Sequence, residues 1–312
     1  MNLQFIHHQE AEISRFNLIS FMIIRSPLLR KLCFSSYMLN YKSGLPLANY
    51  SLDELLPDSL FKSPAVSIRL SDTVGEAAIL LSHYLESFTD SLIVTKDSKP
   101  IGVLGGIELL DGVLKNPTSG FFDNATVSQI MNEKIIIITK QTKLSDLLKQ
   151  WQETRRAFAI MPNQYSGYSA ISARKILEIS NKYGATMTVS EIPKKRIVTF
   201  NDNHTVKDII TSMFENKTRK LVLQNTTSFI NDRIIIEKIV RELNYLRNVK
   251  DFLNMKVAIF KLENAKTISE DWSIQEASKI MYDMLSPYLI VKDQVISPWD
   301  IVMSLGSEKF MM

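Results

Sequence analysis

The chain has 312 residues, of which 45% are hydrophobic and 22% charged, and its net charge is +4. This composition is typical of a soluble globular protein, and the length allows two domains of ordinary size. The positive charge forms no long run of Lys or Arg, so it does not indicate nucleic-acid binding. The single cysteine, Cys33, excludes an internal disulfide and a thiolate metal cluster, which fits a cytoplasmic location.

Residues 1–47 form an N-terminal extension that matches no other part of the chain. Apolar residues at Phe16, Ile19, Met22 and Ile23 have helical spacing, so we expect this extension to be partly helical or loosely ordered. Its apolar run at 16–24 is too short to span a membrane. It also lacks the small-residue cleavage site of a signal peptide.

From residue 50 onward the sequence repeats one pattern four times. Each unit opens with a short segment and continues with a β-branched run, an amphipathic helix, two strands and a second helix, which gives β-α-β-β-α. We place the opening segments at 51–56, 126–131, 188–193 and 248–253, with an insertion at 257–264 in the fourth unit. The first strands are predicted at 66–68, 135–139, 197–200 and 265–268, and the second strands at 91–95, 157–161, 220–224 and 288–292.

The turn from the last strand into the last helix carries the chemistry of each repeat. In repeat four, Ser297 has the position of an N-cap, Pro298 is the first helical residue and Asp300 is at N3, as in a capping box. A carboxylate can accept two hydrogen bonds, which suits the neighbouring hydroxyls of a ribose. The corresponding pairs in repeats one to three are Gly105 and Glu108, Ser172 and Lys175, and Asn231 and Ile234. All four caps are favourable N-cap residues, but only repeats one and four keep the acid.

This pattern resembles the CBS domain, the cystathionine β-synthase motif, over residues 50–305, most clearly at 267–277 and 296–301. The resemblance implies an α+β (α/β) fold of two tandem CBS-domain pairs, or Bateman modules, with a short N-terminal extension. The first pair would span 48–182, with repeats at about 50–115 and 126–180. The second would span 185–312, with repeats at about 188–245 and 248–306.

The resemblance also implies a non-enzymatic regulatory protein. Such a protein would bind an adenine nucleotide (AMP, ADP or ATP) or S-adenosylmethionine in a cleft between repeats and would signal to a protein partner. No cofactor would be required, and no membrane association is expected. A homodimer is implied as well, because the apolar helical faces of such pairs commonly continue into a disc-like assembly in this family.

In this family the hydroxyl and the acid hold ribose and phosphate, and the first strand of the partner repeat covers the adenine. By matching position, the best cleft uses Ser297 and Asp300, with Ile197 and Val198 against the base. Glu108 keeps a carboxylate in repeat one. Ser172 stands beside Lys175, whose charge opposes ribose but suits a phosphate or another anion. Ile234 cannot accept hydrogen bonds, so the third cleft is expected to be empty or filled by side chains.

Basic residues precede or begin the second strands of repeats two and three, where family members often carry phosphate contacts: Arg155, Arg156, Arg219 and Lys220. Arginine can bind phosphate through two parallel hydrogen bonds, and lysine binds it as a point charge. Basic pairs at a strand start are also common on solvated surfaces. Ser297 and Asp300 could likewise serve only to cap a helix.

Signatures of catalysis are missing from the sequence. It contains no H-E-x-x-H, G-x-S-x-G or G-x-G-x-x-G motif and no phosphate-binding loop of the G-x-x-x-x-G-K-[ST] type, so we predict no catalytic or metal-binding residues. Two alternatives to a sensor stay open. One is an interaction scaffold with decayed ligand sites, and the other is a nucleic-acid-linked regulator that uses Arg25, Arg30 and Lys31.

Overall fold

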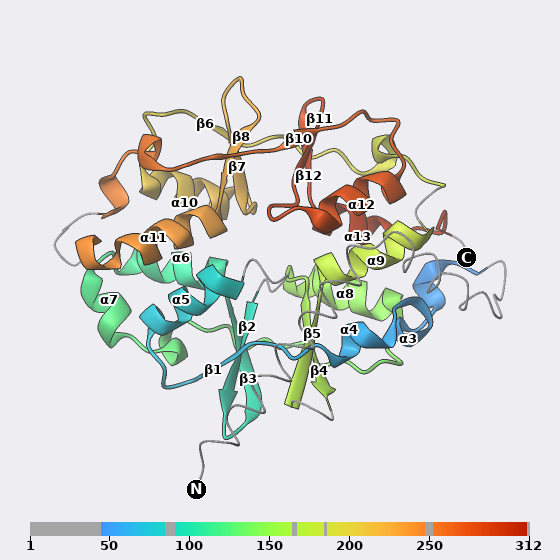
Figure 1. Cartoon of the computed structure of the whole chain (residues 1–312), viewed down its shortest axis with the longest axis horizontal. Coiled ribbons are helices and arrows are strands. Elements are labelled where there is room, and N and C mark those ends of the chain that lie inside the picture. The colour runs from blue at the N-terminus through green and yellow to red at the C-terminus, as the bar shows by residue number, and fades with distance from the viewer. Residues whose placement is uncertain (1–44, 85–90, 164–166, 184–185, 247–251, 311–312) are drawn as a thin grey trace, which may run out of the picture. The chain divides into compact units, whose positions relative to one another are not determined.

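The computed structural model describes residues 45–84, 91–163, 167–183, 186–246 and 252–310 (Figure 1). The predicted N-terminal helix and the basic cluster at Arg25, Arg30 and Lys31 lie outside these residues. Within them, the strands form four small sheets, one for each predicted repeat. In the described residues, no helix is both long and apolar enough to cross a membrane.

The first pair contains repeats one and two. Two short helices come first, α3 (Leu52–Leu55) and α4 (Asp58–Lys62). Repeat one then has β1 (Ser67–Arg69), α5 (Val74–Tyr84), β2 (Ser91–Lys96), β3 (Lys99–Gly105) and α6 (Gly106–Lys115), followed by α7 (Ser119–Asn124). Repeat two has α8 (Leu144–Thr154), β4 (Phe158–Asn163), β5 (Gly167–Ser172) and α9 (Ala173–Tyr183). Its first strand is reduced to a single parallel bridge between Ile137 and Ile160.

The second pair contains repeats three and four. Repeat three has β6 (Thr199–Phe200), α10 (Val206–Glu215), β7 (Lys220–Leu223), β8 (Ser228–Asn231) and α11 (Asp232–Leu246). The strand β9 (Glu263–Asn264) then joins its sheet beside β8. Repeat four has β10 (Lys266–Thr267), α12 (Ile274–Asp283), β11 (Leu289–Val291), β12 (Gln294–Ile296) and α13 (Pro298–Ser304).

Sheet pairing confirms the predicted β-α-β-β-α order. In repeats one, three and four the first strand runs parallel to the second, and the third strand is antiparallel to the second. The helix between the first two strands buries the apolar stripe that the sequence predicts. Trp151 of α8 and Val74 of α5, for example, are 0% exposed. A helix with one apolar face folds stably only when that face is covered, so each stripe fixes its helix against a sheet.

Each repeat's opening segment lies on the other repeat of its pair. The Leu52 amide donates to the Thr142 carbonyl of repeat two (3.0 Å), and the Val127 amide donates to the Asp72 carbonyl of repeat one (2.9 Å). In the second pair, the Val189 amide donates to the Trp272 carbonyl in the same way (2.8 Å). The two repeats of a pair are therefore joined by reciprocal backbone pairing as well as by their cores.

The opening segment of repeat four differs from the prediction at 248–253. The equivalent contact is made by Val257, whose amide donates to the His204 carbonyl (2.9 Å), next to a bridge between Thr205 and Lys256. Residues 257–264 are thus no insertion, because they contain the opening segment and β9. Residues 248–251 lie outside the described part of the chain. The prediction was wrong because Val249 has the spacing of the corresponding valines in the other repeats, whereas the residue that makes the contact, Val257, comes eight residues later.

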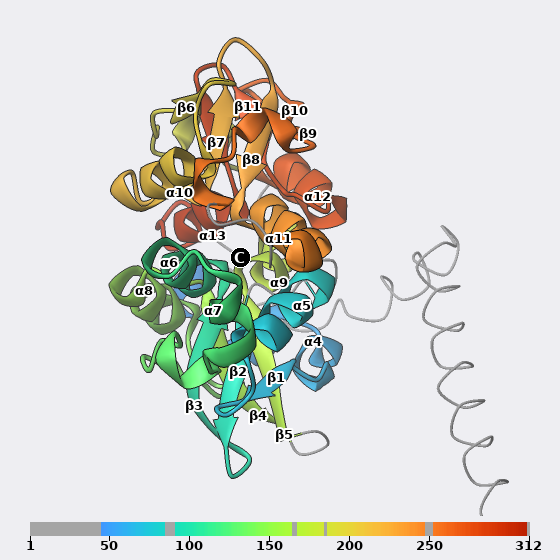
Figure 2. The same ribbon diagram turned by 90° about the vertical axis from the view of Figure 1, so that its left-hand side faces the viewer.

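The two pairs meet through their helices, with the sheets on either side (Figures 1 and 2). α11 packs against α5 and α6, and α9 packs against α12 and α13. The Arg174 guanidinium of α9 reinforces this contact by donating to the carbonyl of Tyr282 (3.0 Å) in the last turn of α12 and to those of Met284 and Leu285 (3.3 Å) just after it. The helical faces that we expected to join two chains are here covered within one chain. A homodimer therefore stays a prediction and would use another surface.

Candidate ligand site

A cavity of about 1070 Å³ is lined by residues from all four repeats. The predicted site residues that line it are Ser297, Asp300, Ile197, Val198, Arg219, Lys220, Glu108, Arg155 and Arg156. Ser172 does not line it, because it is 2% exposed and is buried at the end of β5. The structure therefore brings predicted site residues that are up to about 190 positions apart in the sequence to the wall of one cavity.

Ser297 and Asp300 form the predicted capping box at the start of α13. The Ser297 backbone N–H donates to Oδ2 of Asp300 (2.9 Å), and the Ser297 hydroxyl donates to the same oxygen (2.6 Å). Both residues are buried, at 8% and 7% exposed. One carboxylate oxygen of Asp300 is thus used by the cap, and the other faces the basic residues of repeat three.

Lys195 and Lys220 hold the Asp300 carboxylate in its charged form. The Lys195 ammonium lies 2.5 Å from Oδ1 of Asp300. Burial acts to raise the pKa of Asp300, but the charges of Lys220 and Lys195 and the hydrogen bonds from Lys195 and Ser297 outweigh it, so this pKa lies below its ordinary value. Asp300 is therefore a buried carboxylate that stays ionised at neutral pH.

Lys220 begins β7 and reaches over the ring of Tyr288, with its ammonium 4.9 Å from the ring centroid. Burial lowers the pKa of Lys220 to about 8, although the nearby Asp300 charge acts in the opposite direction. An aromatic face and a carboxylate together stabilise the ammonium form, but less well than water would. Lys220 is consequently a cation that would gain from a further negative charge.

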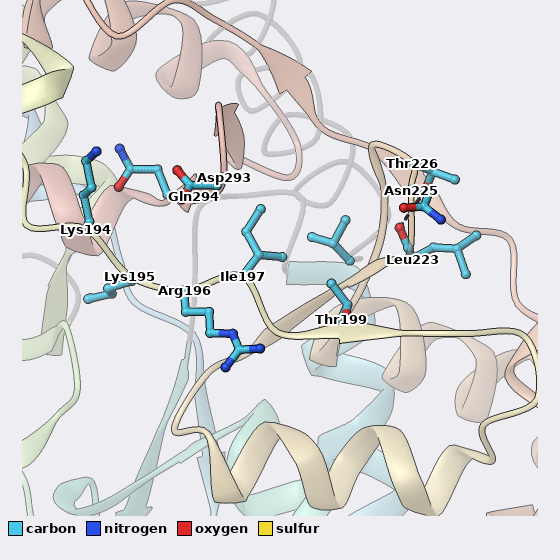
Figure 3. A pocket seen from close by; sticks show the side chains of 11 residues that line it. Lys194, Lys195, Arg196, Ile197, Thr199, Leu223, Asn225, Thr226, Asp293 and Gln294 are labelled. Carbon is cyan, nitrogen blue, oxygen red and sulfur yellow. Dashed lines mark hydrogen bonds between the residues drawn. The ribbon is translucent and has the colours of Figure 1, made fainter.

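Ile197 and Val198, which we predicted in the first strand of repeat three, lie just before β6 (Thr199–Phe200) and line the cavity. The neighbouring residue Arg196 pairs with Gln294 in an antiparallel bridge, which places this segment beside β12 and close to Ser297. Ile197 also lines an outer pocket of about 510 Å³. Figure 3 shows the rest of its lining: Lys194, Lys195, Arg196, Thr199, Val222, Leu223, Asn225, Thr226, Asp293 and Gln294.

In repeat one the predicted acid is already paired. Glu108 accepts a hydrogen bond from the Gly105 amide (2.9 Å) and forms a salt bridge with Arg156 of repeat two. The Arg156 guanidinium also donates to the Ser91 hydroxyl (2.9 Å). The side chains of Glu108 and Arg156 are only 11% and 16% exposed. The acid and the basic residue that we predicted as ribose and phosphate contacts therefore satisfy each other.

The start of α6 in repeat one also lies against Asp232, the first residue of α11 in repeat three. A Cβ built on Gly106 would overlap the carboxylate of Asp232, so any larger residue would have to displace this side chain where the two helix starts approach each other. Asp232 in turn forms a salt bridge with Arg219, whose Nε donates to it over 2.7 Å. Arg219, a predicted phosphate contact, is thus held by a carboxylate of its own repeat.

In repeat two the cleft is filled by the chain itself. Lys175 donates to the carbonyls of Ala170 (2.7 Å) and of Leu60 in α4 (3.3 Å). The Asn163 amide donates to the Lys62 carbonyl (3.1 Å) and so holds the end of the same helix. Burial lowers the pKa of Lys175 to about 8. α4 therefore covers the place beside Ser172 where we expected an anion.

In repeat three the cap works without an acid. The Ile234 amide donates to the side-chain oxygen of Asn231 (2.9 Å), and Ile234 itself is 6% exposed. Asn231 lines the cavity, but the position of the missing carboxylate is apolar. This arrangement agrees with a third cleft that offers no ribose contact.

Comparisons with known proteins bear on the fold. No protein-family model and no curated protein matches the sequence. Among solved structures, the chain is similar to protein MJ1225 from Methanocaldococcus jannaschii, proposed as an archaeal homolog of γ-AMPK. That match has a TM-score of 0.67 and 16% identity, and it covers 81% of this chain and 98% of the other. The chain has the CBS fold. Its four repeats form two tandem Bateman modules.

Two further similarities to solved structures are weaker. An uncharacterized conserved protein from Pyrococcus horikoshii matches with a TM-score of 0.49 and 12% identity, over 79% of this chain and 97% of the other. A CBS-domain protein from Agrobacterium tumefaciens matches with a TM-score of 0.36 and 16% identity, over 45% of this chain and 98% of the other.

The sequence prediction missed Lys195, which contacts Asp300 directly. A signal was present, because the basic run Lys194, Lys195, Arg196 comes immediately before the segment assigned to the base. The closing of CBS repeats one and two by Arg156 and α4 had no such signal, since it depends on contacts between distant segments. Among the described residues, no group of three or more His, Cys, Asp or Glu side chains is arranged to hold a metal ion.

Proposed function

We propose that this chain is a regulatory protein that binds an adenine nucleotide or a related adenosyl ligand between CBS repeats three and four, and that ligand binding alters its contact with a protein partner. The observation that carries this proposal is Asp300: it is a buried, ionised carboxylate on the wall of the large cavity, beside two lysines. Similarity in fold to the archaeal protein proposed as a γ-AMPK homolog supports it.

The chemistry of the cleft fits a nucleoside bearing negative charge. Oδ1 of Asp300 accepts from Lys195, and a carboxylate oxygen can accept a second hydrogen bond, so a ribose hydroxyl can bind while Lys195 stays in place. Ile197 and Val198 supply apolar surface for a base on the neighbouring segment. Lys220 provides a positive charge for a phosphate.

Isothermal titration of the full chain with AMP, ADP, ATP and S-adenosylmethionine tests the proposal. We expect saturable binding of at least one compound, weakened in Asp300→Ala. Absence of binding at millimolar concentration by folded protein would refute the proposal. A structural role for Asp300 alone would lower the melting temperature of the variant and leave nucleotide affinity unchanged.

An interaction scaffold is the second candidate, and a specific observation favours it. The clefts of CBS repeats one and two are closed by the chain's own Arg156 and α4. If the fourth cleft also binds nothing, the cavity walls would serve only to hold the four repeats together. Nucleic-acid regulation rests on residues outside the described part of the chain, so the structure adds no support for it.

A further inference from the structure

We infer that the ligand of the fourth cleft carries at least two phosphate groups, so that nucleoside di- and triphosphates bind and S-adenosylmethionine does not. This inference rests on the proposed function, because it concerns the same cleft. It selects among the adenosyl compounds by their charge.

Basic side chains outnumber acidic ones around the cavity. Among the described residues that line it, nine are Lys or Arg and three are Asp or Glu, which leaves six positive charges in excess when all are ionised. A cavity with walls of one charge sign concentrates ions of the opposite sign, and the effect is stronger than on an open surface. The cavity as a whole therefore favours a polyanion.

Each of the three acids is paired with a lining cation and cancels its charge, so the positive excess comes from the remaining cations. Glu108 pairs with Arg156, Asp232 with Arg219, and Asp300 with Lys195. Another cation of the lining, Arg233, pairs with Glu263 at 2.6 Å outside the cavity. Four lining cations form no salt bridge with any described residue: Arg155, Arg196, Lys217 and Lys220. Lys220 is partly buried, whereas Arg155, Arg196 and Lys217 are exposed at the cavity wall, so a ligand with several phosphate groups can approach more of these charges than a monophosphate can.

The lysines beside Asp300 indicate which adenosyl ligands would not bind. Two ammonium groups, those of Lys195 and Lys220, act on this single carboxylate, so positive charge remains in excess where the sugar would bind. The sulfonium of S-adenosylmethionine is attached to the sugar's 5′ carbon, the same atom that carries phosphate in a nucleotide. A cation there would face like charges, and like charges brought together in a partly buried site are strongly unfavourable.

Titration of Lys220 gives an independent readout. The charged groups that act on it are Asp300, Lys195 and Arg219, and its pKa of about 8 means that it loses its proton just above neutral pH. A bound polyphosphate would stabilise the ammonium form and raise this pKa. Binding would then take up a proton, so affinity should fall as pH rises from 7 to 9.

The test is isothermal titration at low salt with adenosine, AMP, ADP, ATP, S-adenosylmethionine and inorganic tripolyphosphate. We expect affinity to rise from adenosine to ATP, no binding of S-adenosylmethionine, and measurable binding of tripolyphosphate. Lys220→Met should weaken ATP binding by about tenfold and remove its dependence on pH between 7 and 9, and it should weaken adenosine binding less than that of ATP. Lys220→Arg should restore ATP affinity, and Lys266→Met, an exposed lysine of β10 away from the cavity, is the matched control.

The outcomes separate this inference from the proposed function. If AMP binds as tightly as ATP, or S-adenosylmethionine binds, the inference is wrong and the proposed function stands. If tripolyphosphate binds as tightly as ATP and adenosine does not bind, the cavity is a polyphosphate site and the nucleotide function is wrong. If nothing binds to protein that circular dichroism shows to be folded, both are wrong.

Discussion

The second and fourth CBS repeats offer the same cleft in two different states. In both, the residue three positions before the N-cap serine forms an antiparallel bridge with the other repeat of the pair, just before that repeat's first strand. Ser169 pairs with Pro64 in the first pair, and Gln294 pairs with Arg196 in the second. Beside the cap, however, the first pair has α4 and the amine of Lys175. The second pair has a carboxylate that faces a cavity. The shared backbone therefore does not decide whether a cleft can take a ligand.

A few side chains make the difference. A lysine at N3 donates to carbonyls of its own chain, including one in α4. The aspartate at N3 lines a cavity instead, and Lys195 and Lys220 balance its charge. The closed clefts of the first pair thus contribute to stability, and the fourth cleft remains available for binding. Substitutions at Glu108, Lys175, Asp300 and Ser297 test this division between stabilising and ligand-binding clefts.

Glu108→Ala should cost about 3–5 kcal/mol of unfolding free energy, because it leaves the largely buried Arg156 guanidinium without its carboxylate partner. Nucleotide affinity should rise by less than tenfold, since both residues line the cavity and the substitution removes a negative charge from its wall. Urea unfolding followed by circular dichroism measures the loss. The double variant Glu108→Ala with Arg156→Met should recover most of it. A loss below about 1 kcal/mol, or a tenfold change in affinity, would contradict the structural assignment.

Lys175→Met should change how stability depends on pH. Burial lowers the pKa of Lys175 from 10.5 to about 8. Between these values the unfolded chain binds more protons than the folded chain, so this group makes the wild type more stable as pH rises. The difference in unfolding free energy between wild type and variant should therefore shift by about 3 kcal/mol between pH 8 and 10.5, in favour of wild type.

Lys220 undergoes a similar shift, but it is present in both proteins and cancels in the difference. Denaturant titrations at several pH values provide the measurement. Parallel curves for wild type and Lys175→Met would mean that this amine is as well solvated as in the unfolded chain, and that α4 does not close the second cleft.

Asp300→Ala should weaken binding of the preferred nucleotide about ten- to a hundredfold, which corresponds to the roughly 1.5–3 kcal/mol of a hydrogen bond to a charged group. Asp271→Ala removes an exposed acid of the same repeat and serves as the control for net charge. Isothermal titration gives both affinities. Equal weakening by the two substitutions would show that only the overall charge matters and that the fourth cleft is no more specific than the second.

Ser297→Ala should have the smallest effect on binding, less than tenfold, together with a loss of about 0.5–2 kcal/mol in stability from the helix cap. Ser273→Ala is the matched control, because its hydroxyl accepts from the Glu276 amide (3.1 Å) at the start of α12, away from the cavity. Thermal melts and titrations on both variants separate the two roles. If Ser297→Ala and Ser273→Ala behave alike, the serine only caps α13.

The fold was predictable because every repeat keeps its own local signals. Apolar stripes such as Leu144 to Trp151 and caps such as Ser297 lie within a few residues of one another, so a single sequence displays them four times. The opening segment of repeat four was misplaced because only a contact with His204 identifies Val257, and that contact is tertiary.

The site was predictable only in part, and for the same reason. Asp300 could be recognised from its cap, and the structure places it on a cavity with Ile197 and Lys220. Its partner Lys195 lies 105 residues away. Which acid meets which base depends on how the repeats pack, as the pairing of Glu108 with Arg156 also shows. Ligand identity depends on this network of charges more than on any local motif.

Because the opening segment of each repeat pairs with the other repeat of its pair, a single repeat cannot be removed without loss of backbone hydrogen bonds. Residues 51–56 complete repeat two and residues 126–131 complete repeat one, so deleting a single repeat would remove one backbone partner from the repeat that remains. Buried amides and carbonyls left without partners are costly. We therefore expect the smallest part that folds alone to be a pair. Duplication or loss during evolution, and any truncation made in the laboratory, would be tolerated in steps of two repeats.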